Sequence, residues 1–158
     1  LTSVHQSSDA MLSQCGTMSV ELPEPDICLL ANNTSLASAI TNLVHNAVQV
    51  VGQGVDIHLA ARRVETKPNQ VCISVEDNGP GIPDDQIQRI FEPFFTTRSQ
   101  GTGLGLSVVK TVAQAHQGHV EVTNKQQGGA VFSLYLPIKL TTGENDNRFQ
   151  LHSQEDVA

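Results

Sequence analysis

Two glycine-containing segments have the residue types and the spacing to bind phosphate. They are Asp77-Asn-Gly-Pro-Gly-Ile-Pro83 and Gly101-Thr-Gly-Leu-Gly-Leu106. Alternating glycines let a backbone approach a ligand closely, because no side chain stands in the way. An apolar helical pattern follows the second segment at once, and the free amides at the start of a helix form an anion site. The second segment is therefore predicted to cradle phosphate.

The spacing of this second segment excludes three familiar phosphate-binding loops. A dinucleotide-binding fingerprint needs G-x-G-x-x-G directly after a strand, whereas here G-x-G-x-G follows a Phe-rich loop. A P-loop needs Gly-Lys-Ser/Thr, which this segment lacks. The glycine loop of a protein kinase joins two strands, whereas residues 104–116 have a helical pattern.

A pair of asparagines lies on the polar face of a helix predicted over 33–51. Asn42 and Asn46 are four residues apart, so they share that face with two serines and Gln49. A solvated face is the ordinary explanation of such a stripe. This one contains no charged residue, however, and Asn is a poor helix former. Asn oxygens suit Mg²⁺, so a metal or polar ligand is the alternative explanation.

Asp77 stands where a strand predicted over 71–76 ends and a turn begins. An Asp-Asn-Gly turn with local hydrogen bonds explains it without any ligand. The functional alternative is a partly buried carboxylate that accepts a hydrogen bond from a ligand amine.

The segment from Phe91 to Arg98 is unusual for a loop, because it holds three of the five phenylalanines. Phe91 fits a plug in the core. Phe94 and Phe95 are candidates for anchoring a mobile lid, with Arg98 carrying charge toward phosphates. Ser99-Gln-Gly101 would give the lid the flexibility that closing requires.

Helices interspersed with strand pairs must position these residues. Strands are predicted at 18–22, 27–30, 55–64 and 71–76, with a turn at 67–70. Besides the long helix, we expect a weak helical pattern at 1–15, a short helix capped by Asp84 and a helix at 104–116 closed by Gly118. A hairpin of 119–124 with 130–136 follows. This order predicts an α+β fold with helices on one face of a mixed sheet.

Composition limits the class of protein further. A chain of 158 residues fits one globular domain, and a net charge of −7 argues against nucleic acid as a partner. The three cysteines are far apart, which indicates reduced thiols rather than disulfides or zinc. No apolar run approaches the roughly 18–20 residues of a membrane helix. The chain opens on Leu1, as an excised fragment would.

Taken in order, four segments resemble the N, G1, F and G2 boxes of the catalytic ATP-binding domain of bacterial sensor histidine kinases. They are Asn42–Ala47, Asp77–Gly81, Phe91–Phe95 and Gly101–Leu106. The resemblance covers residues 10–138 and implies a Bergerat-type two-layer α/β sandwich that binds Mg-ATP beneath a lid. It leaves 1–9 as a linker toward a missing acceptor hairpin and 139–158 as a polar, disordered tail.

The resemblance also implies a role for each site residue. Asn42 and Asn46 would be the catalytic asparagines, with Asn46 holding Mg²⁺ and Asn42 near the phosphates. Asp77 would recognise the adenine amino group, and Leu104 and Leu106 would pack their helix down. The residues that would bind the nucleotide are Asp77, Gly79, Gly81, Ile82, Thr97, Arg98, Gly101, Thr102, Gly103, Leu104, Gly105 and Leu106.

The function implied is transfer of the γ-phosphate to a histidine on a missing acceptor domain. His5 lacks the context of such an acceptor and is expected to be an exposed histidine. The full-length protein would be a homodimer that signals to a response regulator. Asn46-Ala-Val-Gln49 and the short lid favour regulators of the NtrC type. The domain would be cytoplasmic, in a parent protein that is soluble or membrane-anchored.

Two alternatives stay open from the sequence. One is a non-catalytic module that binds nucleotide and regulates by contact, and the other is a serine kinase of the anti-sigma type. Asn42 stands where related ATPases of the gyrase and Hsp90 superfamily have a Glu that serves as general base. An amide cannot take up that proton, so we expect slow hydrolysis of ATP.

Overall fold

A computed structural model describes residues 12, 15–22, 29, 31–99 and 101–138. The expected linker 1–9, with His5, and the expected tail 139–158 lie outside the described residues. The helical pattern expected at 1–15 lies largely outside them too. Of the strand expected at 27–30, only Leu29 is described, and it belongs to no strand.

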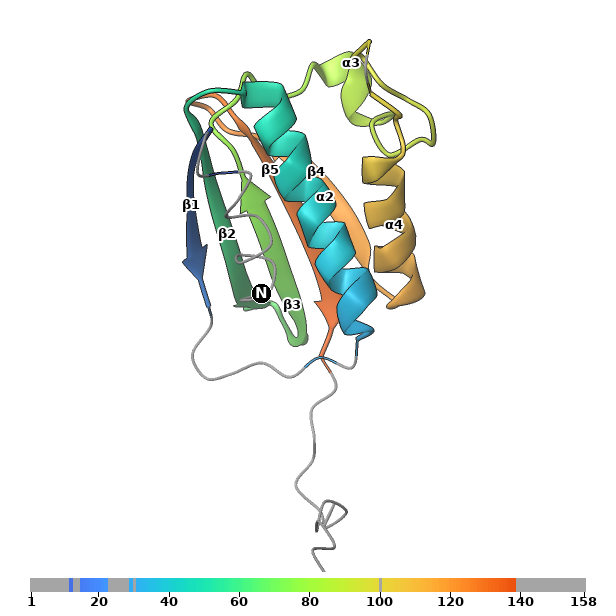
Figure 1. The fold of residues 1–158 in the computed structure, drawn as a ribbon. Coiled ribbons are helices and arrows are strands. Elements are labelled where there is room, and N and C mark those ends of the chain that lie inside the picture. The colour runs from blue at the N-terminus through green and yellow to red at the C-terminus, as the bar shows by residue number, and fades with distance from the viewer. Residues whose placement is uncertain (1–11, 13–14, 23–28, 30, 100, 139–158) are drawn as a thin grey trace, which may run out of the picture.

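Five strands form one mixed sheet in the order β1-β2-β3-β5-β4 (Figure 1). β1 runs parallel to β2, and the other neighbours are antiparallel. Alternate residues of the central strands are buried, including Val71, Ile73 and Val75, because they face the helices. The strands are β1 (Gly16–Glu21), β2 (Val55–Val64), β3 (Lys67–Glu76), β4 (His119–Asn124) and β5 (Ala130–Pro137).

Two long helices, α2 (Asn33–Val51) and α4 (Gly105–Ala115), pack on one face of the sheet (Figure 1), which confirms the predicted α+β class. The predicted apolar face of α2 is buried; its buried residues are Ala39, Ile40, Leu43, Val44 and Ala47. Asn32 caps α2 by accepting a hydrogen bond from the Ser35 amide at 2.9 Å. No helix of the described residues is long and apolar enough to cross a membrane.

His116 joins the two long helices at one end. Its Nε2 accepts a hydrogen bond from the backbone N–H of Asn32 at 3.0 Å, and its Nδ1 donates to the Val112 carbonyl at 2.8 Å. The start of α2 is thereby attached to the end of α4. The other ends, the C-terminus of α2 and the N-terminus of α4, consequently lie together at the opposite end of the sandwich (Figure 1).

Two local predictions were wrong. The turn between β2 and β3 is Glu65–Thr66, and Lys67–Gln70 already belongs to β3. Pro68 fits this strand because it lies at a register shift, where no ladder amide is required. Asp84 does not cap α3 (Asp84–Ile87) but is its first residue, after Pro83. The end of α4 agrees with the prediction: after Gln117, whose φ is 59°, the Gly118 amide donates to the Ala113 carbonyl at 2.8 Å and closes the helix.

Candidate functional site

A cleft of about 740 Å³ opens at the end of the sandwich where α2 ends and α4 begins. Its size lies within the roughly 300–1,000 Å³ of small-molecule and cofactor sites. All the site residues expected from the sequence line it, except Asp77 and Gly79. The structure therefore brings together segments from α2, from residues 80–83 and from residues 95–106.

The lining of the cleft carries little charge. Arg98 is the only Lys or Arg among the described residues that line it, and none of them is Asp or Glu. The chain as a whole has a net charge of −7. Positive potential for an anionic ligand must therefore come from Arg98, from backbone amides and from any bound metal.

Asn42 and Asn46 line the cleft, as the functional explanation of the polar stripe requires. A Cβ added to Gly105 would lie 3.5 Å from Asn42 Oδ1, which shows how closely the start of α4 approaches this asparagine. The amides in the first turn of a helix have no partner within the helix. Asn42 therefore lies beside the free amides at the N-terminus of α4.

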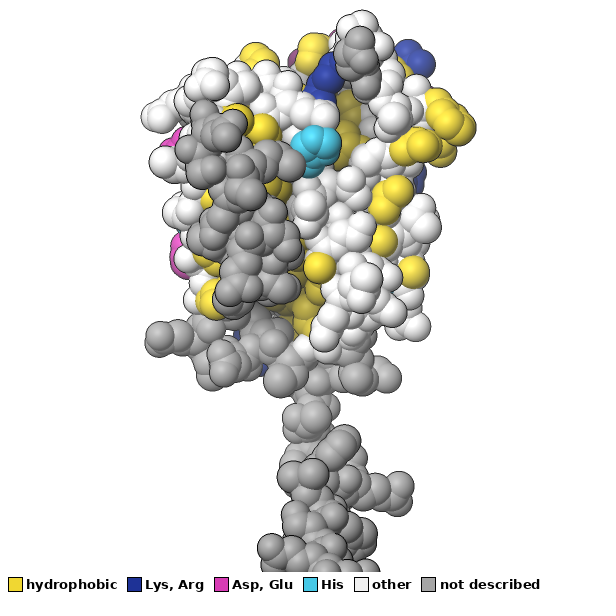
Figure 2. Space-filling view, in the orientation of Figure 1, with side chains coloured by type: hydrophobic (Ala, Val, Ile, Leu, Met, Phe, Trp, Pro, Cys, Tyr) yellow, Lys and Arg dark blue, Asp and Glu magenta, His cyan; other side chains and the backbone are white. Residues whose placement is uncertain are grey.

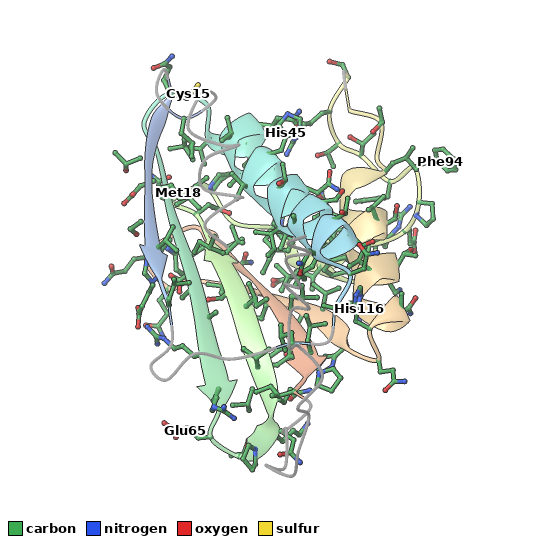
Figure 3. All side chains as sticks on the ribbon, turned by 60° about the horizontal axis from the view of Figure 1, so that its bottom comes forward. Cys15, Met18, His45, Glu65, Phe94 and His116 are labelled. Carbon is green, nitrogen blue, oxygen red and sulfur yellow. The ribbon has the colours of Figure 1, made fainter. Side chains whose placement is uncertain are left out.

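Arg98 spans the mouth of the cleft and contacts two residues of α2. Its Nη2 donates to Asn46 Oδ1 at 3.0 Å and to the Asn46 carbonyl at 3.4 Å, and its Nη1 donates to Gln49 Oε1. Gln49 also bonds His45, its Nε2 lying 2.9 Å from His45 Nε2. His45 lies at the upper end of α2 (Figure 3). On the face seen in Figure 2, one histidine is exposed below a basic side chain. Partial burial lowers the pKa of the Arg98 guanidinium below its ordinary value.

Asp77 is 5% exposed, and one of its oxygens is engaged by the backbone. Oδ1 accepts from the Gly79 amide at 2.8 Å and from the Ala130 amide at 3.2 Å. Oδ2 accepts no hydrogen bond from the described residues. Every buried side-chain nitrogen or oxygen among the described residues has a hydrogen-bond partner, so Oδ2 is not one of the buried atoms and is open to solvent. Asp77 therefore stabilises the turn through Oδ1, and its role toward a ligand stays a prediction.

Two asparagines that the sequence did not single out hold the loop after Asp77. Asn78 accepts from the Asp56 amide at 2.9 Å and donates to the Gly54 carbonyl at 3.0 Å. Asn124 bonds both backbone groups of Ile82. Asn124 is 42 residues from Ile82; only the position of β4 in the sheet brings them together, so no local pattern could have identified this contact.

The lid segment and the glycine segment each differ from expectation at one residue. Phe91 packs edge-on against Phe132, with ring centroids 6.3 Å apart, as a core plug should. Phe95 lines the cleft and packs under Arg89. Phe94, in contrast, is 75% exposed and points away from the fold (Figure 3), so the prediction that it anchors the lid is wrong. Leu104 is 39% exposed, because it precedes α4 at the rim of the cleft, and does not pack the helix down.

Gly103 has a structural reason to be glycine. Its φ is 66°, and an added Cβ would lie 2.5 Å from the backbone carbon of Phe94. Phe94 itself has a φ of 66°, and its amide donates to the Gly103 carbonyl at 2.9 Å. The glycine segment thus packs against the backbone of the lid and also lines the cleft.

The residues present fit a magnesium ion that takes few protein ligands and is otherwise held by waters and substrate phosphates. No group of three or more His, Cys, Asp or Glu among the described residues could hold a metal. Asn46 Oδ1 is an oxygen donor inside the cleft, and Mg²⁺ commonly takes one or two protein ligands beside waters and substrate phosphates.

Comparison with known proteins identifies relatives of this chain. The family described as histidine kinase-, DNA gyrase B-, and HSP90-like ATPase matches residues 31–140. The sensor histidine kinase ZraS of Escherichia coli (strain K12) is 39% identical over 120 residues, which make up 76% of this chain and 24% of ZraS. The chain thus spans about a quarter of the length of this relative.

Two solved structures share the fold. The catalytic domain of histidine kinase ThkA, in a nucleotide-free form, is similar with a TM-score of 0.78 and 29% identity, over 87% of this chain and 89% of that one. Full-length ShkA in complex with AMPPNP is similar with a TM-score of 0.72 and 28% identity, over 85% of this chain and 29% of ShkA.

Proposed function

The chain belongs to the family of histidine kinase-, DNA gyrase B- and HSP90-like ATPases, and we propose that it is the catalytic module of a sensor histidine kinase. In this role it binds Mg-ATP and donates the γ-phosphate to a histidine on a separate acceptor domain. One observation carries the proposal. A single cleft brings the asparagine pair, the only Lys or Arg among its described lining residues and the free amides of α4 to one place.

The adenine would lie at the end of the cleft formed by residues 77–83. Asp77 Oδ2 is free to accept a hydrogen bond from the adenine amino group, while Oδ1 stays on the backbone. Ile82 and Phe132 both line the cleft and offer apolar contact to the base. Backbone clamps by Asn78 and Asn124 preorganise this end, which lowers the entropy lost on binding.

The phosphates would lie at the other end, against residues 101–106. First-turn amides of α4 and the Arg98 guanidinium stabilise negative charge there. Asn46 would hold Mg²⁺, with Asn42 beside the phosphate chain. The ion, when bound, supplies charge neutralisation for the phosphate oxygens.

The transfer itself requires no proton acceptor within the cleft. A neutral imidazole nitrogen of the acceptor forms a bond to the γ-phosphorus. The bond to the β–γ bridging oxygen breaks, and its electron pair leaves with ADP. The chain's own residues position the nucleotide and stabilise the charge on the transferred group. Thr97 and Arg98, at the rim, would face the terminal phosphate.

The wider assignments follow from this role. The full-length kinase would carry the acceptor domain and form a homodimer. It would signal to a response regulator of the NtrC type. The module would work in the cytoplasm, where ATP is available. Nothing in the cleft favours the non-catalytic module or the anti-sigma-type serine kinase over this function.

Phosphoryl transfer in the full-length protein tests the proposal. Incubation with Mg²⁺ and γ-labelled ATP should give an acid-labile, alkali-stable phosphoprotein, with the label on histidine. Asn46→Ala should abolish labelling, whereas Gln114→Ala, on the exposed side of α4, should not. Acid-stable label on serine would favour the serine kinase, and nucleotide binding without any label would favour the non-catalytic module.

A further inference from the structure

The contact between Arg98 and α2 joins two parts of the cleft that are far apart in sequence. Arg98 and Asn46 are 52 residues apart, and Arg98 and Gln49 are 49 apart. Asn46 and Gln49 lie three positions apart on α2, so both present an oxygen to one guanidinium. A planar guanidinium with several fixed donors suits such a two-point contact.

The backbone around Arg98 is shaped to direct its side chain into the cleft. The Arg98 amide donates to Thr96 Oγ1 at 3.1 Å, and the Arg98 carbonyl accepts from the Gly101 amide at 3.2 Å. These bonds close a tight turn at the base of the side chain. The orientation of Arg98 therefore does not depend on Asn46 alone.

Gln49 is itself held from both sides. Its Oε1 accepts from Arg98, and its Nε2 lies 2.9 Å from His45 Nε2 on the preceding turn of α2. A side chain with both ends of its amide engaged keeps one orientation. Gln49 is thus a fixed acceptor for the arginine.

The Arg98 contact competes with the metal of the proposed function. Asn46 Oδ1 accepts from Arg98 Nη2, and the same oxygen would be the protein ligand of Mg²⁺. A guanidinium and a divalent cation that share one oxygen repel each other at close range. Arg98 must therefore leave Asn46 when the metal binds there.

We propose that Gln49 is a positioning residue that keeps Arg98 at the phosphate end of the cleft while the metal replaces the arginine at Asn46. The arginine, released from Asn46, contacts the γ-phosphate of ATP. ADP has no such phosphate, so with ADP the arginine gains nothing from leaving and opposes the metal. The exchange therefore makes the module discriminate ATP from ADP. This inference rests on the proposed function.

Calorimetric titration of the chain with ATP and with ADP, each in excess Mg²⁺, tests the exchange without any measurement of activity. Arg98→Met should weaken ATP binding about tenfold, the value of one charge-assisted hydrogen bond. The same variant should bind ADP two- to fivefold more tightly, because nothing then opposes the metal. Gln49→Met should weaken ATP binding about fivefold and leave ADP binding within twofold.

Gln114→Ala is the matched control, a glutamine on an exposed helical surface outside the cleft, and should bind both nucleotides like wild type. A merely structural role of Arg98 and Gln49 would weaken ATP and ADP binding to the same extent, and that result would overturn the exchange. Wild-type chain that binds neither nucleotide would overturn the proposed function as well.

Discussion

Asn124, the last residue of β4, holds Ile82 by both of its backbone groups. Its Oδ1 accepts from the Ile82 amide at 2.8 Å, and its Nδ2 donates to the Ile82 carbonyl at 2.7 Å. The neighbouring Gly81 has a φ of 80°, and an added Cβ there would lie 2.8 Å from Asn124 Oδ1. One side chain therefore sets the conformation of the loop that forms one end of the cleft.

Replacing Asn124 should weaken binding of the base but not of the phosphates. Asn124→Ala removes both hydrogen bonds to Ile82, and Asn124→Asp sets a carboxylate oxygen against the Ile82 carbonyl. Both variants should lose about 1 kcal/mol of ATP binding free energy, the net value of one or two such bonds. Binding of Mg-tripolyphosphate, which has no base, should be unchanged. Asn69→Ala, an exposed position outside the cleft, is the control.

Gly103→Ala should lose more stability than the positive φ of Gly103 alone explains, because the added Cβ meets the lid. Gly103 and Gly54 both have positive φ, at 66° and 80°, where an alanine costs about 1–2 kcal/mol. An added Cβ meets the Phe94 backbone at 2.5 Å at position 103 and nothing within 4 Å at position 54. In urea denaturation, Gly103→Ala should therefore be more destabilised than Gly54→Ala. Only Gly103→Ala should also lose nucleotide affinity; equal effects of the two variants would contradict a role for the Phe94 contact.

Periodicity was enough to predict the elements that carry the site. The buried face of α2 and the polar face with Asn42 and Asn46 both follow from 3.6-residue spacing, and the alternation at Val71, Ile73 and Val75 follows from the pleat of a strand. These patterns are local. The order of the motifs along the chain then indicated the family.

Contacts between distant elements could not be predicted in this way. Arg98 meets Asn46 across 52 residues, and Asn124 meets Ile82 across 42 residues, because the order of the strands and the packing of the helices bring them together. The left-handed conformation of Phe94 is equally invisible locally, since a bulky residue rarely adopts it. Pro68 indicated a turn, although a register shift allows it within β3.

His116 should contribute to stability by joining the two helices that frame the cleft. Its ring accepts from the Asn32 amide and donates to the Val112 carbonyl. His116→Ala leaves both backbone groups without this partner and should lower the free energy of unfolding by about 1–2 kcal/mol. The exposed His119→Ala should change it much less. Denaturant titration at neutral pH measures both, and equal losses would argue against the joining role.

Cys72 should react slowly with alkylating reagents in the folded chain. Burial, opposed by hydrogen bonding to Ser133 and Tyr135, raises the pKa of the Cys72 thiol. Only the thiolate reacts, so alkylation of a chain that retains Cys72 alone should stay slow at pH 7.5 and accelerate at a higher pH than in the unfolded chain. Because the folded pKa is the higher one, the contribution of Cys72 to stability is full below the ordinary thiol pKa. It is lost as the pH rises through the folded value.

The chain should hydrolyse ATP slowly even though it binds it. Asn42 faces the cleft beside the start of α4, and its amide cannot accept a proton from an attacking water. No Asp or Glu among the described residues lining the cleft can replace it. Steady-state release of inorganic phosphate should therefore fall far below the roughly 1–1,000 s⁻¹ of typical enzymes. Rapid turnover by the chain alone, abolished by Asn46→Ala, would show instead that water is a good acceptor and that a general base lies elsewhere.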